Sequence, residues 1–230
     1  MNKSWNADQL PADLPANPML LAEDWIGEAR AAGLQRHVNA MTLATVSASG
    51  QPTSRIVLCK DFVPDPGYLV FYTNYESRKS TDIAANANVA AHFHWDAIGR
   101  QIRIEGIAIR SPDAESDRYF ASRDRASQLG AWGSDQSAEI GSRAALLAQT
   151  RIRAQELGVA DSGQAPGGDD GPPIARPPHW GGFRIWPIAV ELWREGADRI
   201  HERALWKRQL ERASEHHFTV TAWTATLLQP

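Results

Sequence analysis

The 230-residue chain has only one cysteine, Cys59, so it cannot form an internal disulfide. A lone thiol suits a reducing compartment. The sequence has no apolar run long enough to cross a membrane. Its N-terminal stretch, MNKSWNADQLPADLP, lacks the apolar segment of a signal peptide. These absences predict a soluble cytoplasmic protein.

The chain also has little excess charge of either sign. Lys and Arg number 24 and Asp and Glu 27, which gives a net charge of −3. Bulk binding to nucleic acid or to an anionic membrane is therefore not expected. Hydrophobic residues make up 43% of the chain, an ordinary value for a globular protein that can bury a sizeable core.

Several ligand-binding patterns are missing. No predicted strand is followed by GxGxxG, and GxxxxGK[ST] does not occur, which argues against a Rossmann domain and a P-loop. The seven histidines show no metal-ligand spacing. His92 and His94 stand one residue apart in a predicted strand, which is more typical of a polar sheet face than of a metal site.

Helical signals occur in three places. Asn17 followed by Pro18 is a typical helix start and Gly33 a typical end, which predicts a helix over residues 18–32. A short helix is predicted over 78–86. Residues 112–156, which open with Ser111-Pro112-Asp113, predict two or three helices.

The remaining periodic segments alternate as strands do, with a parity change at Gly106 that predicts a bulge. Short connections between neighbouring strands favour antiparallel pairing. The predicted fold is mainly β, a closed or partly closed barrel with helices outside. The predicted strands are 41–46, 54–60, 68–73, 89–95, 101–110, 182–193, 199–206 and 218–226.

We expect one domain over residues 17–230, preceded by a flexible polar arm at 1–16. The helical segment 112–156 would be an insert between strands. Residues 157–179 are rich in Gly, Pro and Asp, which predicts a flexible loop.

The stretch RIVLCK, residues 55–60, places two cations at the rims of an apolar strand. Ile56 and Val57 are β-branched and favour a strand. Arg55 and Lys60 are five residues apart, so they should point to opposite faces. A cation at each rim suggests an anionic partner on each side.

Three further clusters carry cations. If Ser77 caps a helix, Arg78 and Lys79 lie in its first turn and oppose the helix dipole, at a cost of a few tenths to ~1 kcal/mol each. A phosphate bound at that helix start would reverse this cost, whereas a solvated surface turn would tolerate it.

The other two clusters depend on spacing. In DRIHER, a strand would align Arg199, His201 and Arg203 on one face. In RYFASRDRASQLGAW, helical spacing of four would align Tyr119, Arg123 and Ser127. All three side chains can donate hydrogen bonds to a phosphate. Each cluster alone is compatible with a solvated surface. Together they contain more cations than one phosphate needs and indicate two anion sites.

In this order and spacing, the motifs resemble those of the pyridoxine (pyridoxamine) 5′-phosphate oxidase family, over about Leu14 to Pro230. The resemblance implies a homodimer of FMN-binding split β-barrels, with FMN at the subunit interface. It implies oxidation of pyridoxamine or pyridoxine 5′-phosphate to pyridoxal 5′-phosphate, with O₂ as acceptor, H₂O₂ as product and no metal. The motifs are RIVLCK, VFYTNYESRK, GRQIRIEG, YFASRDRASQLGAW, DQS, HWGGFR and RIHER.

The resemblance also assigns residues. Arg199 and His201 would lie over the substrate ring as catalytic residues, and some FMN contacts near the C-terminal half would come from the second subunit. The implied substrate-phosphate contacts are Lys60, Tyr119, Arg123 and Ser127. The implied FMN contacts are Arg55, Ile56, Val57, Leu58, Cys59, Lys60, Tyr72, Thr73, Arg78, Lys79, Gln101, Gln136, Ser137, Trp180 and Arg203.

The chain departs from the family pattern in four places. Its N-terminal arm is short and lacks the family's Arg-Arg-Glu-Tyr-like stretch, so closure of a lid over the substrate stays open. Leu227 stands where the family usually has an arginine. The loop 158–178 is longer than usual, and Cys59 replaces an aliphatic residue, which indicates packing and not a catalytic thiol.

Two alternatives remain. The first is a phenazine-pathway type of FMN oxidase, which would share the barrel and the RxHER strand but would not need a substrate-phosphate set. The second is a non-enzymatic protein that binds FMN or pyridoxal phosphate. Lys60, Tyr119, Arg123 and Ser127 favour the vitamin B6 oxidase over both.

Overall fold

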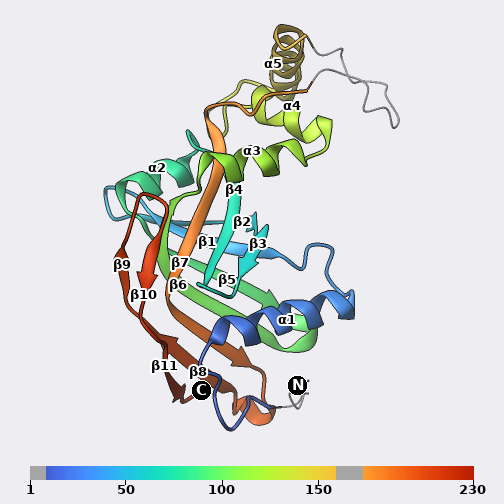
Figure 1. The fold of residues 1–230 in the computed structure, drawn as a ribbon. Helices are drawn as coiled ribbons and strands as arrows, with labels where there is room; N and C mark the ends of the chain where they lie inside the picture. The colour runs from blue at the N-terminus through green and yellow to red at the C-terminus, as the bar shows by residue number, and fades with distance from the viewer. Residues whose placement is uncertain (1–8, 159–172) are drawn as a thin grey trace.

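A computed structural model describes residues 9–158 and 173–230. The protein is mainly β, with helices at the periphery of a curled sheet (Figure 1). The helices are α1 (Pro18–Ala32), α2 (Arg78–Ala85), α3 (Asp113–Ala121), α4 (Arg125–Gly133) and α5 (Arg143–Glu156), with short 3-10 turns η1 (Asp96–Ile98) and η3 (Ala197–Arg199). The strands are β1 (Ala40–Val46), β2 (Pro52–Leu58), β3 (Asp61–Val63), β4 (Tyr68–Asn74), β5 (Asn88–Trp95), β6 (Arg100–Arg110), β7 (Trp180–Arg194), β8 (Glu202–Lys207), β9 (Leu210–Arg212), β10 (Phe218–Val220) and β11 (Thr224–Leu228).

The main sheet runs β11-β8-β7-β6-β5-β1-β2, and β4 pairs with both β3 and β7. Every pairing in it is antiparallel, as the short connections predicted. The long strand β7 therefore carries β6, β4 and β8 along its length. The predicted fold class, a mainly β split barrel with peripheral helices, is confirmed.

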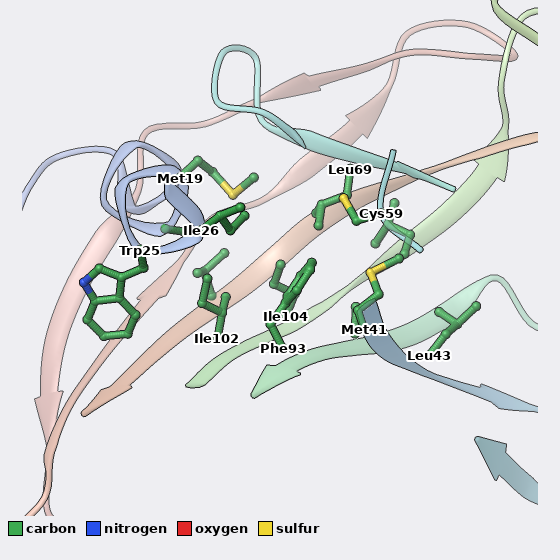
Figure 2. Packing of buried hydrophobic residues seen from close by; sticks show 14 of the residues in the cluster. Met19, Trp25, Ile26, Met41, Leu43, Cys59, Leu69, Phe93, Ile102 and Ile104 are labelled. Carbon is green, nitrogen blue, oxygen red and sulfur yellow. The ribbon is translucent and has the colours of Figure 1, made fainter. Parts of the chain in front are cut away.

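Helix α1 fills the inner side of the curled sheet. Asn17 Oδ1 accepts from the Met19 N–H at 3.0 Å, and Gly33 ends the helix in the left-handed conformation, both as predicted. Figure 2 shows Trp25 and Ile26 facing strand residues that include Ile102. Burial of these apolar faces against each other makes this contact the core of the barrel.

The three helices α3, α4 and α5 lie together at one end of the molecule, between β6 and β7 in the chain (Figure 1). They share a second apolar cluster with Trp180, which is the first residue of β7. The sequence predicted these helices and the bulge at Gly106, where the register of β6 against β7 shifts. A side chain at Gly106 would overlap the Trp186 carbonyl.

The predicted strand 54–60 is wrong at its end. Strand β2 stops at Leu58, and the Lys60 N–H donates to the Val70 carbonyl at 2.7 Å, in the turn that leads to β3. Arg55 and Lys60 therefore do not belong to one strand, and the opposite-face argument does not apply. β3 was not predicted, because three residues are too few to show a period.

Two C-terminal predictions are also wrong. Asp198 and Arg199 have positive φ angles of 56° and 64°, and β8 begins only at Glu202, so 199–206 is not one strand. The segment 218–226 divides into β10, which pairs with β9, and β11, which returns to β8. The pattern of alternation did not reveal that the chain changes sheets.

The single helix expected to align Tyr119, Arg123 and Ser127 is interrupted. α3 ends at Ala121, and Asp124 caps the start of α4, so the three residues come from two helices and the turn between them. The spacing argument was wrong in its geometry, although all three side chains reach one cavity.

The predicted N-terminal arm is described from residue 9 onward. There the Leu10 N–H donates to Glu202 Oε2 at 2.8 Å, and the Pro15 carbonyl accepts from Trp206, so this part is anchored on β8. Most of the predicted loop 157–179 lies outside the described residues. Of the helices in the described ranges, none is long and apolar enough to cross a membrane.

Candidate functional site

A cavity of about 680 Å³ opens where α3 and α4 meet β2 and β4. It brings together residues far apart in the sequence, from Ile56 to Trp180. Nine predicted cofactor contacts line it: Ile56, Val57, Leu58, Lys60, Tyr72, Thr73, Lys79, Gln136 and Trp180. The complete predicted substrate-phosphate set lines the same cavity: Lys60, Tyr119, Arg123 and Ser127.

An aromatic stack forms one wall of the cavity. The Tyr72 ring lies 3.9 Å from the Tyr119 ring and 5.5 Å from the Trp180 ring, centroid to centroid, with interplanar angles of 15° and 9°. Tyr72 comes from β4, Tyr119 from α3 and Trp180 from the start of β7. The stack therefore joins the helical end of the molecule to the sheet and gives the cavity a flat, apolar surface.

Two glycines allow this wall to form. Gly181 and Gly182 pair with Thr73 and Tyr72 across β7 and β4. A Cβ on Gly182 would lie 2.6 Å from Ser111 Oγ and 2.9 Å from the Tyr72 ring. Only glycine permits so close an approach of backbone and side chain.

Replacing Gly182 with alanine is expected to lower the free energy of unfolding by ~1–3 kcal/mol, the usual cost of overpacking, and to displace Tyr72. Urea denaturation measures the first effect. The control is Gly27→Ala in α1, where a Cβ meets no atom within 4 Å and should stabilise the helix by ~0.5–1 kcal/mol. Equal stability of both variants would contradict the role given to Gly182.

Lys79 is a buried cation in the first turn of α2. Its Nζ donates to Thr73 Oγ1 at 2.9 Å, Ser77 Oγ at 2.9 Å and Gln136 Oε1 at 2.7 Å, three uncharged oxygens. Burial and then the charge of Arg55 lower the pKa of Lys79 to about 8. A buried ammonium held by neutral oxygens is costly unless an anion joins it. Ser77 begins α2 as predicted, although its hydroxyl donates to Asn74 O and accepts no capping hydrogen bond from a backbone N–H of the helix.

Arg55 is fixed beside this lysine by a polar network. Its guanidinium donates to Thr45 Oγ1 at 2.8 Å and to Thr53 Oγ1 at 2.6 Å. Both threonines donate to Asp82 Oδ2, which lies 3.8 Å from Arg55 Nη2. The network holds Arg55 on the inner side of β2, whereas Ile56 is 65% exposed on the other.

The second group of cations lies against the aromatic stack. The Arg123 guanidinium carbon lies 4.7 Å from the Trp180 ring centroid, and Lys60 Nζ lies 5.7 Å from that of Tyr119. Within the described residues, the buried Arg123 Nη1 has no hydrogen-bond partner. Burial lowers the pKa of Arg123. An unpaired buried N–H of a cation is suited to bind an anion.

Other predicted cofactor residues lie outside the cavity lining. The Arg78 N–H donates to Ser137 Oγ at 3.3 Å, next to Lys79. Gln101 Oε1 lies 3.0 Å from His92 Nε2, on β6 and β5. Cys59 is buried in the core, where burial raises the pKa of its thiol to about 12, as expected of a packing residue.

The predicted residues of the RIHER segment are at the opposite end of β7 from Trp180. The His201 ring packs 4.7 Å from the Trp193 ring, and its Nδ1 accepts from the Gly196 N–H. Arg203 Nε donates to Glu191 Oε1 at 2.8 Å, and Arg103 Nη1 donates to Glu191 Oε2 at 2.8 Å, so two guanidinium groups of the same chain share this carboxylate. Arg199 is exposed. One chain therefore does not bring these residues into the cavity.

The sequence predictions missed several cavity residues, among them Asn74, Ser122, Asp124 and Ser134. Asp124 is a residue type that favours the N-cap position of a helix, a start signal that could have been recognised. The others enter the cavity through the turns that end β4, α3 and α4, and local spacing carries no sign of that.

Comparisons with known proteins agree with this geometry. Residues 27–154 match the family described as "Pyridoxamine 5'-phosphate oxidase", more than half of the chain. The chain belongs to this family. Residues 180–230 match "Pyridoxine 5'-phosphate oxidase C-terminal dimerisation region", which contains Arg199, His201 and Arg203.

Two similar curated relatives are called pyridoxine/pyridoxamine 5′-phosphate oxidase. The one from Burkholderia cenocepacia (strain HI2424) is 43% identical and the one from Burkholderia mallei (strain SAVP1) 44%; each match covers 95% of this chain and 92% of the relative. A similar solved structure is PhzG from Burkholderia lata 383 in complex with tetrahydrophenazine-1-carboxylic acid. It is 27% identical, with a TM-score of 0.78 over 97% of this chain and 98% of that one.

Membership of this family supports an oxidoreductase and suggests a flavin cofactor. Within residues 9–158 and 173–230, no group of three or more His, Cys, Asp or Glu side chains is placed to hold a metal ion.

Proposed function

We propose that the protein uses FMN to oxidise pyridoxamine or pyridoxine 5′-phosphate to pyridoxal 5′-phosphate in the cytoplasm, with O₂ as acceptor and H₂O₂ as product. The observation that carries the proposal is the cavity with two cation groups and an aromatic wall. Lys79 belongs to one group, and Lys60 and Arg123 belong to the other. Two phosphate-bearing molecules, cofactor and substrate, would each use one group.

The residues present fit the phosphate of FMN. Lys79 is buried with only neutral acceptors, Arg55 is fixed beside it, and Arg78 lies in the same first turn of α2. A helix start adds backbone N–H groups and a favourable dipole for an anion. FMN, when bound, supplies the two-electron acceptor that O₂ reoxidises.

The chain's own groups would bind and orient the substrate. Arg123, Lys60 and the Tyr119 hydroxyl are donors suited to its phosphate, at a distance from the bond that reacts. Binding energy from a remote phosphate can hold the reacting carbon in position and so raise turnover as well as affinity. The apolar faces of Tyr72 and Trp180 exclude water from that side of the cavity.

We further propose a homodimer in which the second copy completes the site with Arg199 and His201. The C-terminal segment matches a dimerisation region. Ile200, between these two residues, is 71% exposed, and Ile56 beside the cavity is 65% exposed. Large apolar side chains exposed at both places support a subunit contact there.

A phenazine-pathway type of oxidation is the second candidate, because the structure is similar to PhzG over almost the whole chain. The substrate-phosphate group distinguishes the two candidates. A phenazine carboxylic acid would offer Arg123 and Lys60 one carboxylate charge, whereas a phosphate dianion offers a charge to each of the two cations. Their place in the cavity supports the phosphorylated substrate.

The purified protein tests the proposal directly. We expect a yellow flavin spectrum with one noncovalent FMN per subunit. Adding pyridoxamine 5′-phosphate in air should consume O₂ and release H₂O₂, ammonia and pyridoxal 5′-phosphate, with water supplying the aldehyde oxygen. A bound flavin without any turnover would favour a carrier of FMN or pyridoxal phosphate over an oxidase.

FMN affinity should depend on pH through Lys79. Its pKa is lowered to about 8 in the free protein, and a bound phosphate anion should raise it again. Binding therefore takes up a proton, so affinity should be highest below pH 8 and fall as the pH rises above 8. Calorimetry in two buffers at pH 8.5 measures the uptake. Lys79→Arg stays charged and should lose the dependence; constant wild-type affinity from pH 7 to 9.5 would contradict this.

A further inference from the structure

Asp124 places a carboxylate in a cavity wall that otherwise suits an anion. It caps α4 and lines the cavity with Lys60, Arg123 and Ser127. Ser127 engages both of its oxygens: Oδ1 accepts from the backbone N–H at 2.8 Å and Oδ2 from the hydroxyl at 2.7 Å. These two hydrogen bonds lower the pKa of Asp124, which is therefore ionised at neutral pH.

The bond from the Ser127 hydroxyl affects what the cavity can bind. A serine hydroxyl has a single proton. While Asp124 accepts that proton, Ser127 offers an approaching phosphate only lone pairs, which a phosphate dianion cannot use. The carboxylate also repels the dianion, against the attraction of Lys60 and Arg123.

Arg123 does not depend on Asp124 for its position. Its guanidinium lies over the Trp180 ring at 4.7 Å, and it also lies 5.8 Å from the Phe120 ring centroid. Removing the charge of Asp124 should therefore leave the cation in place. The effect of Asp124 on an anion is then separable from the packing of the cavity.

We propose that Asp124 is a specificity-determining residue: by holding the Ser127 proton and adding a negative charge, it limits the affinity of this cavity for phosphate and narrows the preference for phosphorylated over unphosphorylated substrates. The claim about substrate preference rests on the proposed function. The claim about phosphate affinity concerns binding to the cavity and does not depend on that function.

The test uses Asp124→Asn in the FMN-loaded protein. Asparagine is an equally good helix cap, so α4 should remain folded. Its oxygen can accept from the Ser127 N–H, but its NH₂ group cannot accept from the hydroxyl. Calorimetric titration with inorganic phosphate and with pyridoxal 5′-phosphate should show binding about tenfold tighter than wild type, the effect of one charge-assisted hydrogen bond. Binding of unphosphorylated pyridoxal should not change.

A Ser127→Ala background provides the matched control. There, Asp124→Asn should give a smaller gain, because the freed hydroxyl is absent. A residue that only capped the helix would change thermal stability and not the phosphate affinity. Unchanged or weaker phosphate binding in a folded Asp124→Asn protein overturns the proposal, and so does phosphate binding too weak to detect in both proteins. If Asp124→Asn binds phosphate more tightly but pyridoxamine 5′-phosphate does not reduce the flavin, the role of Asp124 is supported. Only the proposed oxidase function is then contradicted.

Discussion

Replacing both Arg78 and Lys79 with alanine is expected to weaken FMN binding by about two to four orders of magnitude. Each charge-assisted contact to a phosphate contributes ~1.5–3 kcal/mol, and about 1.4 kcal/mol corresponds to tenfold in affinity. The loss arises because Lys79 is buried with neutral acceptors and Arg78 shares its helical turn. Flavin fluorescence during titration of the apoprotein measures the dissociation constant.

The same variant should not weaken the apoprotein. Removing a buried cation whose hydrogen-bond acceptors are all neutral relieves a desolvation cost, so thermal stability without FMN should stay level or rise. Lys207→Ala removes one exposed positive charge on β8, away from the cavity, and as a control should leave FMN affinity unchanged. Wild-type FMN affinity in the double variant would show that the cofactor phosphate binds elsewhere.

Arg123→Ala is expected to reduce the preference for pyridoxamine 5′-phosphate over pyridoxamine by about 10- to 100-fold while FMN stays bound. A hydrogen bond to a charged group contributes ~1.5–3 kcal/mol, and the buried Nη1 of Arg123 is available to make one. Steady-state kinetics with both substrates give the ratio of kcat/KM values.

Because a remote phosphate can orient the substrate, kcat for the phosphorylated form should also fall. Arg143→Ala removes an equal charge from the exposed start of α5 and should leave the preference unchanged. If Arg123→Ala kept the full preference for the phosphorylated substrate, its phosphate would have to bind outside this cavity.

The sequence was sufficient for features with a local cause. Asn17 and Gly33 delimit α1 through capping, and Gly106 marks the bulge through close approach to Trp186. The strand periods and short connections predicted an antiparallel barrel, closed or partly closed, and the family resemblance implied a split barrel. The resemblance to the family then identified candidate FMN and substrate contacts. The structure places two of them, Lys79 and Arg123, in the lining of one cavity.

Features that depend on tertiary contacts could not be predicted in this way. Lys60 leaves β2 because the chain turns to pair β3 with β4, and no residue period records that turn. The helix break at Asp124 lets its carboxylate accept a hydrogen bond from the Ser127 hydroxyl. The resemblance assigns Arg203 to FMN, and no residue spacing indicates that its guanidinium also pairs with Glu191 on the neighbouring strand.

The distance of His201 from the cavity has a different origin. Its segment lies at the far end of β7 from Trp180, so a single chain cannot place His201 in the cavity that Trp180 lines. The proposal requires a second copy for the complete site. Exposed Ile200 and the match of residues 180–230 to a dimerisation region support that requirement.

Anaerobic stopped-flow mixing of the FMN-loaded protein with substrate tests the central claim most directly. With pyridoxamine 5′-phosphate we expect the flavin absorbance to bleach in a single saturable phase, and unphosphorylated pyridoxamine should bleach it far more slowly. The ratio of the two bleaching rates measures how much the substrate phosphate, bound by Lys60 and Arg123, contributes to flavin reduction. The absence of O₂ prevents reoxidation of the flavin during the measurement. Equal rates and affinities for the two forms, or no bleaching with either, would contradict a vitamin B6 phosphate oxidase.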